Sequence, residues 1–358
     1  GYHTAYFGKW HLGGPPRDAF ISHYNRLGFQ YWNANNCNHD YLHGYYDDNN
    51  NIRHPIEGYA PAGETELVLE YLEKAHKKQE PFAVFLNFGI PHDPYFALPE
   101  GELERYQKKK LTLRGNCEKK LLQGERGMDA YEPERYYAGY YAHIRQLDLQ
   151  IGRILDELKK LEELGNTIVV YTSDHGDMLG SHGYLNKQMY FEESSHVPLL
   201  ISWPGHIPGG KRETAVGLVD LAPTVLGLLG LRFEGQTDGE DLSDVVLGRE
   251  PERERFVYLY SYVPCHQAAA RRISSWRAIT DGRWMLAVDQ KRTVLGLYHT
   301  QEDPLQMRDL QLEEAYAPKK QELLEKLDEE VHSHDGYVDW KILLCQHGLD
   351  SLWDESEA

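Results

Sequence analysis

Apolar residues follow two spacings along the first part of this chain. Helical spacing runs through residues 64–78 and 133–164. Short, mostly apolar runs, which are typical of strands covered on both faces, occupy residues 2–8, 82–88 and 167–172. Because these strands alternate with helices, the sequence predicts an α/β fold in which helices cover a mostly parallel sheet.

Beyond about residue 235 the apolar runs become shorter and are separated by turn residues. They lie at residues 256–262, 276–280, 284–288 and 295–299. This pattern predicts a small antiparallel sheet, accompanied by an amphipathic helix at residues 318–330. We therefore expect two domains, a catalytic core at residues 1–235 and a small C-terminal subdomain at residues 236–358.

Other segments fit neither spacing as clearly. Residues 18–61 are rich in Asn, His and aromatic residues and predict surface loops around a cleft, whereas the charged residues 100–131 predict an excursion or lid. Residues 196–203 predict another strand. Residues 216–230 predict a strand end followed by a helix that Asp220 caps.

Composition and charge narrow the possible functions. A chain of 358 residues with 41% hydrophobic content is long enough to bury a large core. The formal net charge of -18 argues against general binding of nucleic acid or of an anionic membrane, because both require a surplus of Lys and Arg. No apolar run is long and uninterrupted enough to cross a bilayer. An anionic substrate would have to be held by a few focused cations or by a metal ion.

The cysteines give no sign of a disulfide framework or a zinc site. Cys37, Cys117, Cys265 and Cys345 are widely scattered and form no C-x-x-C pair. We expect free thiols. The sequence leaves the cellular compartment open.

Asp174 and His175 follow the predicted strand at residues 167–172. In a turn beyond the strand, the carboxylate and the imidazole can both reach one divalent cation, and Gly176 lets the backbone come close. A helix cap or a hydrogen bond within the loop is the structural alternative.

Lys9 and His11 flank Trp10 directly after the first predicted strand. A fixed cation and a titratable donor in one small loop suit an anionic tetrahedral group that must be held and then gain or lose a proton. A solvated lysine and a packing histidine are the alternatives.

Two more residues offer similar chemistry. His92 lies between two prolines after the strand at residues 82–88, which suits a general acid of fixed direction. Lys187 follows the Asp174 loop and could bring a second cation to it. Together these residue types predict a site that binds and splits a sulfate or phosphate ester.

Several strings resemble one known family. Residues 1–13, GYHTAYFGKWHLG, resemble the second signature of the formylglycine-dependent sulfatases. The later strings occur in the order expected for that family: PH at 91–92, SDHG at 173–176, Lys187, EESSHVP at 192–198 and DLAPT at 220–224. The similarity extends over essentially the whole chain.

The resemblance implies an alkaline-phosphatase-like α/β core with a small C-terminal subdomain, one bound Ca²⁺, and hydrolysis of sulfate esters. By position, Asp174 and His175 would be two of the calcium ligands. Lys9 and Lys187 would hold sulfate oxygens. His11 would assist turnover of the sulfated intermediate.

His92 would then protonate the alcohol that leaves.

The chain also differs from the family pattern. The family's nucleophile is a Cys or Ser in a C/S-x-P/A-x-R string, which a maturation enzyme converts to formylglycine, and it precedes the second signature together with two Asp ligands. None of the four cysteines has this context. We therefore expect this chain to be the C-terminal part of a longer reading frame, inactive alone and weak in calcium affinity.

Within this resemblance the substrate stays open. The aromatic and polar residues after residues 18 and 100 favour sulfated carbohydrates. A phosphonate or phosphodiester hydrolase of the same superfamily, a sulfamidase acting on an N-sulfate, and an inactive remnant that binds a sulfated ligand are the alternatives.

Overall fold

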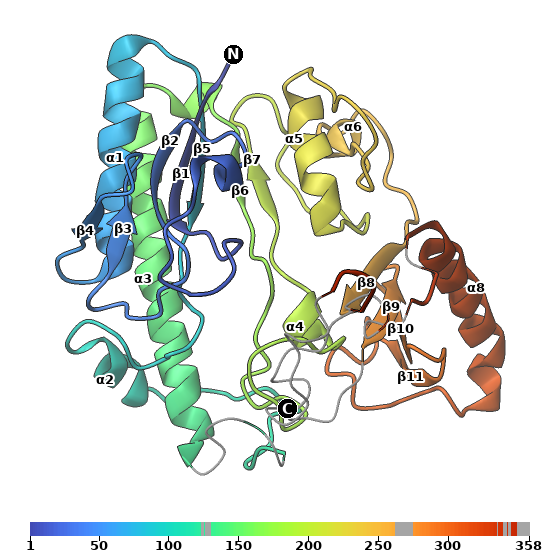
Figure 1. Ribbon diagram of the computed structural model, residues 1–358. Helices are drawn as coiled ribbons and strands as arrows, with labels where there is room; N and C mark the ends of the chain where they lie inside the picture. Colours follow the sequence, from blue (N-terminus) through green and yellow to red (C-terminus); the bar gives the residue numbers. More distant parts are fainter. Residues whose placement is uncertain are drawn as a thin grey trace. The chain divides into compact units, whose positions relative to one another are not determined.

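The computed structural model describes residues 1–122, 125, 130–261, 275–334, 336–338, 342 and 345–348 (Figure 1). The chain divides into two compact units. The first unit comprises Gly1–Leu113 and Glu132–Ile168, and the second comprises Arg114–Tyr131 and Val169–Ala358. The domain boundary expected near residue 235 stays a prediction.

A five-stranded mixed sheet forms the centre of the first unit. Its strands are β1 (His3–Lys9), β2 (Tyr31–Asn35), β3 (Tyr45–Asp47), β4 (Arg53–Pro55) and β5 (Phe82–Asn87), in the order β4-β3-β2-β1-β5. Strand β1 is parallel to both β2 and β5, whereas β3 is antiparallel to its two neighbours. The carboxyl ends of β1, β2 and β5 therefore meet at one edge of the sheet.

The sequence predicted that residues 18–61 form surface loops. In the structure this segment also contains three of these strands and a short 3₁₀-helix, η1 (His23–Arg26). The sequence of strand β2 does not show the apolar run that is typical of a covered strand. Trp32 and Ala34 are buried in an aromatic cluster, but Asn33 and Asn35 between and after them are also buried. Polar residues at buried positions break the apolar run by which a covered strand is found.

Two long helices accompany this sheet. Helix α1 (Ala60–Lys78) packs against α3 (Pro133–Lys160) and contacts β1, and the short α2 (Glu102–Gln107) packs against α3 (Figure 1). Both long helices have a proline in their first turn, where its missing N–H is not needed. The 3₁₀-helix η3 (Leu164–Asn166) ends this unit's chain. The helices predicted at residues 64–78 and 133–164 are confirmed.

Two strands are less buried than their sequences predict. Strand β5 was expected to be covered on both faces, but Phe85 is 54% exposed. In the order of the sheet β5 is the last strand, with β1 as its neighbour on one side. In the second unit, β6 (Val169–Tyr171) pairs with β7 (Leu200–Ser202), and Leu200 is 65% exposed. Apolar composition alone does not distinguish an end strand from a central one.

Asp220 does not cap a helix as predicted. Its carboxylate does not bond to the first turn of α5 (Leu221–Leu228). It accepts hydrogen bonds instead from the main-chain N–H groups of Gly217 (2.7 Å) and Glu240 (2.8 Å) and from the guanidinium of Arg255. Asp220 thus caps the N-terminal end of the preceding 3₁₀-helix, η4 (Leu218–Asp220). It also links segments of the second unit that are far apart in the sequence.

The antiparallel sheet predicted near the C-terminus is confirmed. It consists of β8 (Val257–Ser261), β9 (Trp276–Thr280), β10 (Trp284–Asp289) and β11 (Val294–His299), in the order β11-β10-β9-β8. The predicted helix is α8 (Ala317–His334), after the 3₁₀-helix η5 (Glu314–Tyr316). Its Leu323, Leu327 and Val331 pack on this sheet as one buried core. Two short helices, α4 (Glu192–Ser195) and α6 (Ser243–Val246), complete the second unit's described elements.

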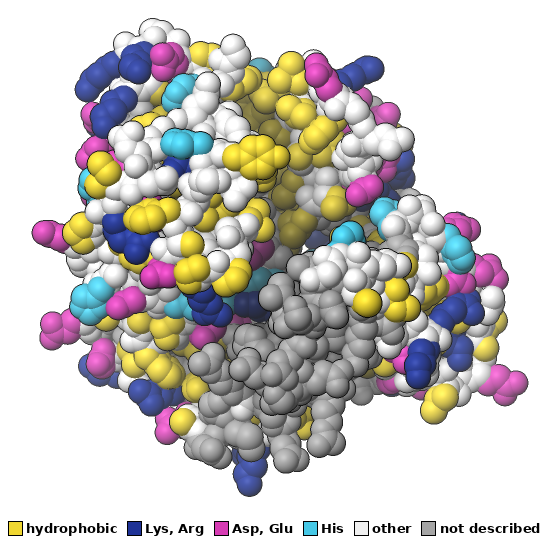
Figure 2. Space-filling view, in the orientation of Figure 1, with side chains coloured by type: hydrophobic (Ala, Val, Ile, Leu, Met, Phe, Trp, Pro, Cys, Tyr) yellow, Lys and Arg dark blue, Asp and Glu magenta, His cyan; other side chains and the backbone are white. Residues whose placement is uncertain are grey.

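The surface carries both signs of charge. On the face shown in Figure 2, Lys and Arg side chains are interspersed with Asp and Glu. Strong attraction of an anion to this face would therefore have to come from single, well-placed cations. None of the helices among the described residues has the length and apolar character needed to cross a membrane.

Candidate active site

Lys9 is the last residue of β1, and a glycine places it there. Gly8 has a left-handed φ of 83°, and a Cβ at this position would lie 2.2 Å from the main-chain oxygen of Asn87. Only a residue without a side chain fits this approach of β1 to the end of β5. Lys9 therefore lies beside the loop that carries His92.

Trp10 anchors the loop that follows. Its indole is 7% exposed and packs edge-on against Trp32, with the ring centroids 5.1 Å apart. The main-chain N–H of His11 donates to the oxygen of Asn36 at 2.6 Å, and His11 itself is exposed with a φ of 59°. The loop thus holds Lys9 and His11 on either side of a buried side chain.

A histidine that the sequence analysis did not single out links Lys9 to His92. The Lys9 Nζ lies 3.5 Å from the Nε2 of His39, and the rings of His39 and His92 have centroids 4.7 Å apart. The Sγ of Cys37 also lies 3.5 Å from the same Nε2. His39 follows β2, so it comes from the same sheet edge as Lys9 and His92. The polar run NNCNHD directly after a strand, at residues 35–40, is the signal that could have identified it.

His39 is neutral at neutral pH. Burial, followed by the positive charges of His92 and Lys9, lowers its pKa to about 3. A lysine ammonium only donates hydrogen bonds, so the Nε2 of His39 must be the acceptor and its proton must be on Nδ1. The ring therefore accepts from Lys9 without adding a charge of its own.

The His92 loop is held by hydrogen bonds. The Tyr41 hydroxyl lies within bonding distance of the main-chain oxygens of Gly89 (2.8 Å) and His92 (3.0 Å). The Nδ1 of His92 is 2.9 Å from both the main-chain oxygen and a carboxylate oxygen of Asp93. Because Nδ1 serves Asp93, Nε2 is the nitrogen with which His92 would exchange a proton with a ligand.

Asp174 and His175 lie in the second unit, directly after β6. The Asp174 carboxylate is 82% exposed and lies 3.6 Å from the Nε2 of His175. The Nδ1 of His175 bonds to the main-chain oxygen of Gly176 at 2.8 Å. A Cβ on Gly176 would lie 2.0 Å from the oxygen of Glu193, so glycine is required for this close turn.

These two residues were predicted to be ligands of a metal ion. Calcium takes about six to eight oxygen ligands, of which the Asp174 carboxylate can supply two, and an imidazole nitrogen suits it poorly. No group of three or more His, Cys, Asp and Glu side chains placed to hold a metal ion occurs among the described residues. Of the two residues, only Asp174 offers oxygen ligands, and the predicted calcium site stays a prediction.

The Lys187 loop is tied to the Asp174 loop by Asp177. The Asp177 Oδ1 accepts from the main-chain N–H groups of Leu179 (3.0 Å) and Asn186 (3.1 Å). The N–H of Met178 donates to the oxygen of Asn186 at 2.7 Å. Lys187 is therefore carried on a segment fixed to the end of β6, as its position in the sequence suggested. The meeting of this set with Lys9, His11 and His92 stays a prediction.

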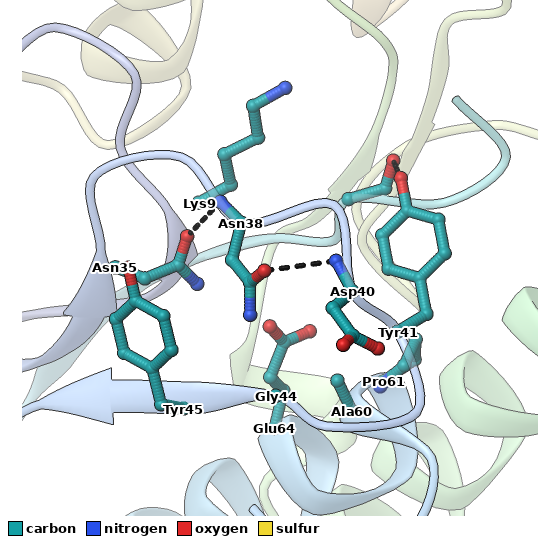
Figure 3. A pocket seen from close by; sticks show the side chains of 11 residues that line it. Lys9, Asn35, Asn38, Asp40, Tyr41, Gly44, Tyr45, Ala60, Pro61 and Glu64 are labelled. Atoms are coloured by element: carbon teal, nitrogen blue, oxygen red, sulfur yellow. Dashed lines mark hydrogen bonds between the residues drawn. The ribbon is translucent and has the colours of Figure 1, made fainter. Parts of the chain in front are cut away.

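The first unit also contains a pocket at the carboxyl end of its sheet (Figure 3). Its free volume is about 10 Å³, room for one water-sized group, and Lys9, Asn35, Asn38, Asp40 and Glu64 are among its lining residues. Only Lys9 was predicted to lie here, because the others come from a segment predicted as loops and from the N-terminal part of α1.

Comparisons with known proteins match this chain to one family. Residues 1–231 match the sulfatase family profile, and residues 180–333 match the profile described as N-sulphoglucosamine sulphohydrolase, C-terminal. The chain is 33% identical over 353 residues to an ulvan-active sulfatase of Formosa agariphila, an alignment that covers 94% of this chain and 66% of that protein.

Two further similarities point the same way. The N-acetylglucosamine-6-O-sulfatase of Bacteroides thetaiotaomicron is 26% identical over 409 residues, covering 92% of this chain and 70% of that protein. The crystal structure of YidJ from Bacteroides fragilis superposes with a TM-score of 0.78 at 25% identity, covering 92% of this chain and 74% of the other. With its family profile, its curated relatives and its fold in agreement, the chain belongs to the sulfatase family.

Proposed function

We propose that this chain forms the larger part of an enzyme that hydrolyses sulfate esters of carbohydrates. The observation that carries the proposal is the contact of Lys9 with His39 and of His39 with His92, which puts a cation and a titratable imidazole side by side at the sheet edge. Two relatives whose names specify a substrate act on ulvan and on N-acetylglucosamine 6-O-sulfate. The chain spans about two thirds of the first of these relatives.

In this proposal Lys9 and Lys187 hold sulfate oxygens and offset the charge that develops on them. As the bond between sulfur and the sugar oxygen breaks, an oxygen of the nucleophile becomes bonded to sulfur, the electron pair of the broken bond goes to the sugar oxygen, and His92 gives that oxygen a proton from Nε2. His11 assists the release of sulfate from the covalent intermediate. Neutral His39 orients Lys9 without competing for the anion.

Asp174 and His175 are proposed as two ligands of a calcium ion, with the remaining ligands supplied from outside the described residues. A bound calcium ion would lower the cost of gathering negative charge around sulfur. The two-residue donor set supports this part of the proposal only as a partial site.

The nucleophile is proposed to be a formylglycine encoded upstream of residue 1. Within the chain, Cys37 is buried beside His39, and neither Cys37, Cys117 nor Cys345 is followed by the string that directs this modification. Cys265 lies outside the described residues and also lacks the string. A formylglycine-generating maturation enzyme is then a partner of the complete protein. Reading the coding DNA upstream of residue 1 for C/S-x-P/A-x-R tests this step.

The role of His92 is tested with the complete gene product and two substrates. A general acid matters most when the leaving group is a poor one, so His92→Ala should reduce kcat on N-acetylglucosamine 6-sulfate by roughly 10²–10⁴-fold and on 4-nitrophenyl sulfate by much less. His43→Ala is the matched control, because that side chain is exposed on the neighbouring loop. Equal losses on the two substrates would contradict the role.

A further inference from the structure

The pocket of the first unit contains a buried carboxyl group that the protein does not satisfy. Glu64 is 6% exposed, and its Oε2 has no hydrogen-bond partner among the described residues. Figure 3 shows this carboxyl pointing into the pocket, toward Asn38 and Asp40. A buried polar group without a partner destabilises a folded protein, so its presence calls for an explanation.

Two amide groups face the same space. The Oδ1 of Asn35 accepts from the main-chain N–H of Asn38, and the Oδ1 of Asn38 accepts from the main-chain N–H of Asp40, both at 2.9 Å. Since a main-chain N–H only donates, these bonds fix which end of each amide is oxygen. The amide nitrogens are therefore the donors on the pocket side, as Figure 3 shows.

The carboxyl of Glu64 is uncharged at neutral pH. Burial raises its pKa to about 8, so the group carries a proton that it can donate while its other oxygen accepts. A hydroxyl group also donates one hydrogen bond and accepts others. The amide donors and the acid are thus complementary to an alcohol.

Lys9 lines the same pocket, but in Figure 3 its amine extends away from Glu64. One ligand that reaches both must carry its anionic group and its hydroxyl on different atoms of one framework. A sulfated sugar has this form, whereas an inorganic sulfate or an aryl sulfate does not.

We infer that Glu64, Asn35 and Asn38 form a subsite for a hydroxyl group of the sugar ring that bears the sulfate ester. This inference rests on the proposed function, because the sulfate is taken to lie at Lys9. It assigns substrate selectivity to the N-terminal part of α1, the last residue of β2 and the loop after β2.

The test compares two substrates that differ in this hydroxyl chemistry, using the complete gene product. Glu64→Leu removes both the donor and the acceptor and should lower kcat/KM on N-acetylglucosamine 6-sulfate about tenfold, the effect of one or two lost hydrogen bonds, while leaving 4-nitrophenyl sulfate within about twofold. Glu64→Gln keeps both a donor and an acceptor and should retain most of the parent kcat/KM on the sugar sulfate. The control is Glu70→Leu, an exposed position on the same helix. Equal losses on the two substrates, or no loss on either, would overturn the inference.

Binding separates this inference from the proposed function. N-acetylglucosamine 6-sulfate is titrated into the ¹⁵N-labelled chain of 358 residues, and the side-chain amide signals of Asn35 and Asn38 are followed. Shifts that Glu64→Leu abolishes support the subsite even if the complete protein hydrolyses no sulfate ester, in which case only the proposed function fails. An enzyme that hydrolyses the sugar sulfate with neither shift nor an effect of Glu64→Leu retains its function and has no such subsite.

Discussion

At the scale of single residues, His39 shows how a side chain can assist a site by staying neutral. It lies 3.5 Å from the ammonium of Lys9 and beside the ring of His92, and burial, followed by the effect of these two neighbours, lowers its pKa to about 3. Asp93 opposes this shift, and Arg17 adds to it. A protonated His39 would bring a second positive charge next to the ammonium of Lys9, so acid should loosen this end of the sheet.

The pH dependence of stability follows from that shift. The unfolded chain protonates its histidines below about pH 6.5, but folded His39 resists protonation until about pH 3. Its contribution to stability is therefore complete above pH 6.5 and is lost as the pH falls toward 3. Buried His143, whose pKa is lowered to about 4 mainly by burial, adds a loss of the same sign.

We predict that His39→Gln reduces the fall in Tm between pH 6.5 and pH 4, measured by thermal unfolding followed by circular dichroism. His23→Gln, an exposed position in η1, should leave the profile unchanged. A parallel profile for His39→Gln and the parent would show that His39 is not held neutral by its neighbours.

At the scale of elements, the sequence predicted what depends on local pattern. The strands β8 to β11 are short apolar runs between turn residues, the helix α8 has one apolar face, and all of them occur where they were expected. Strand β2 was missed because Asn33 and Asn35 are buried beside Trp32. The exposure of Phe85 in β5 was missed because strand order is a property of the sheet and not of the segment.

The residues of the candidate site also fall into those that local sequence could identify and those that depend on the fold. Lys9 and His92 could be identified from strings that follow predicted strands. His39 and Glu64 could not be assigned a place, because their importance arises from contacts with residues 30 or more positions away or from a pocket that the fold creates. The bonding of Asp220 was predicted wrongly, because its partner Arg255 lies 35 residues further along the chain.

The junction of β1 and β5 is tested by a glycine pair. Gly8 and Gly28 both have left-handed φ values, 83° and 91°, but a Cβ on Gly28 would meet nothing within 4 Å whereas one on Gly8 would meet Asn87. Gly28→Ala should cost about 1 kcal/mol of unfolding free energy for the backbone strain alone. Gly8→Ala should cost roughly 2–4 kcal/mol, because the clash adds to the same strain. Urea unfolding of both variants measures the difference, and equal costs would show that β1 does not need this close approach.

At the scale of the whole molecule, the two units carry different parts of the proposed chemistry. Lys9, His39 and His92 belong to the first unit, and Asp174, His175 and Lys187 belong to the second. The family match at residues 1–231 includes both sets. The two sets together contain no nucleophile and only two of the proposed calcium ligands. The proposal therefore requires the complete gene product.

The central claim is most directly tested by measuring what the complete gene product releases from matched esters. Matured with a formylglycine-generating enzyme, it is assayed with 4-nitrophenyl sulfate, 4-nitrophenyl phosphate and N-acetylglucosamine 6-sulfate, beside its Lys9→Ala variant. We predict release of sulfate from the first and third, at least about 100-fold faster than release of phosphate, and a loss of two or more orders of magnitude in the variant. Preferred hydrolysis of the phosphate ester, or sulfate release that Lys9→Ala leaves unchanged, would contradict the account.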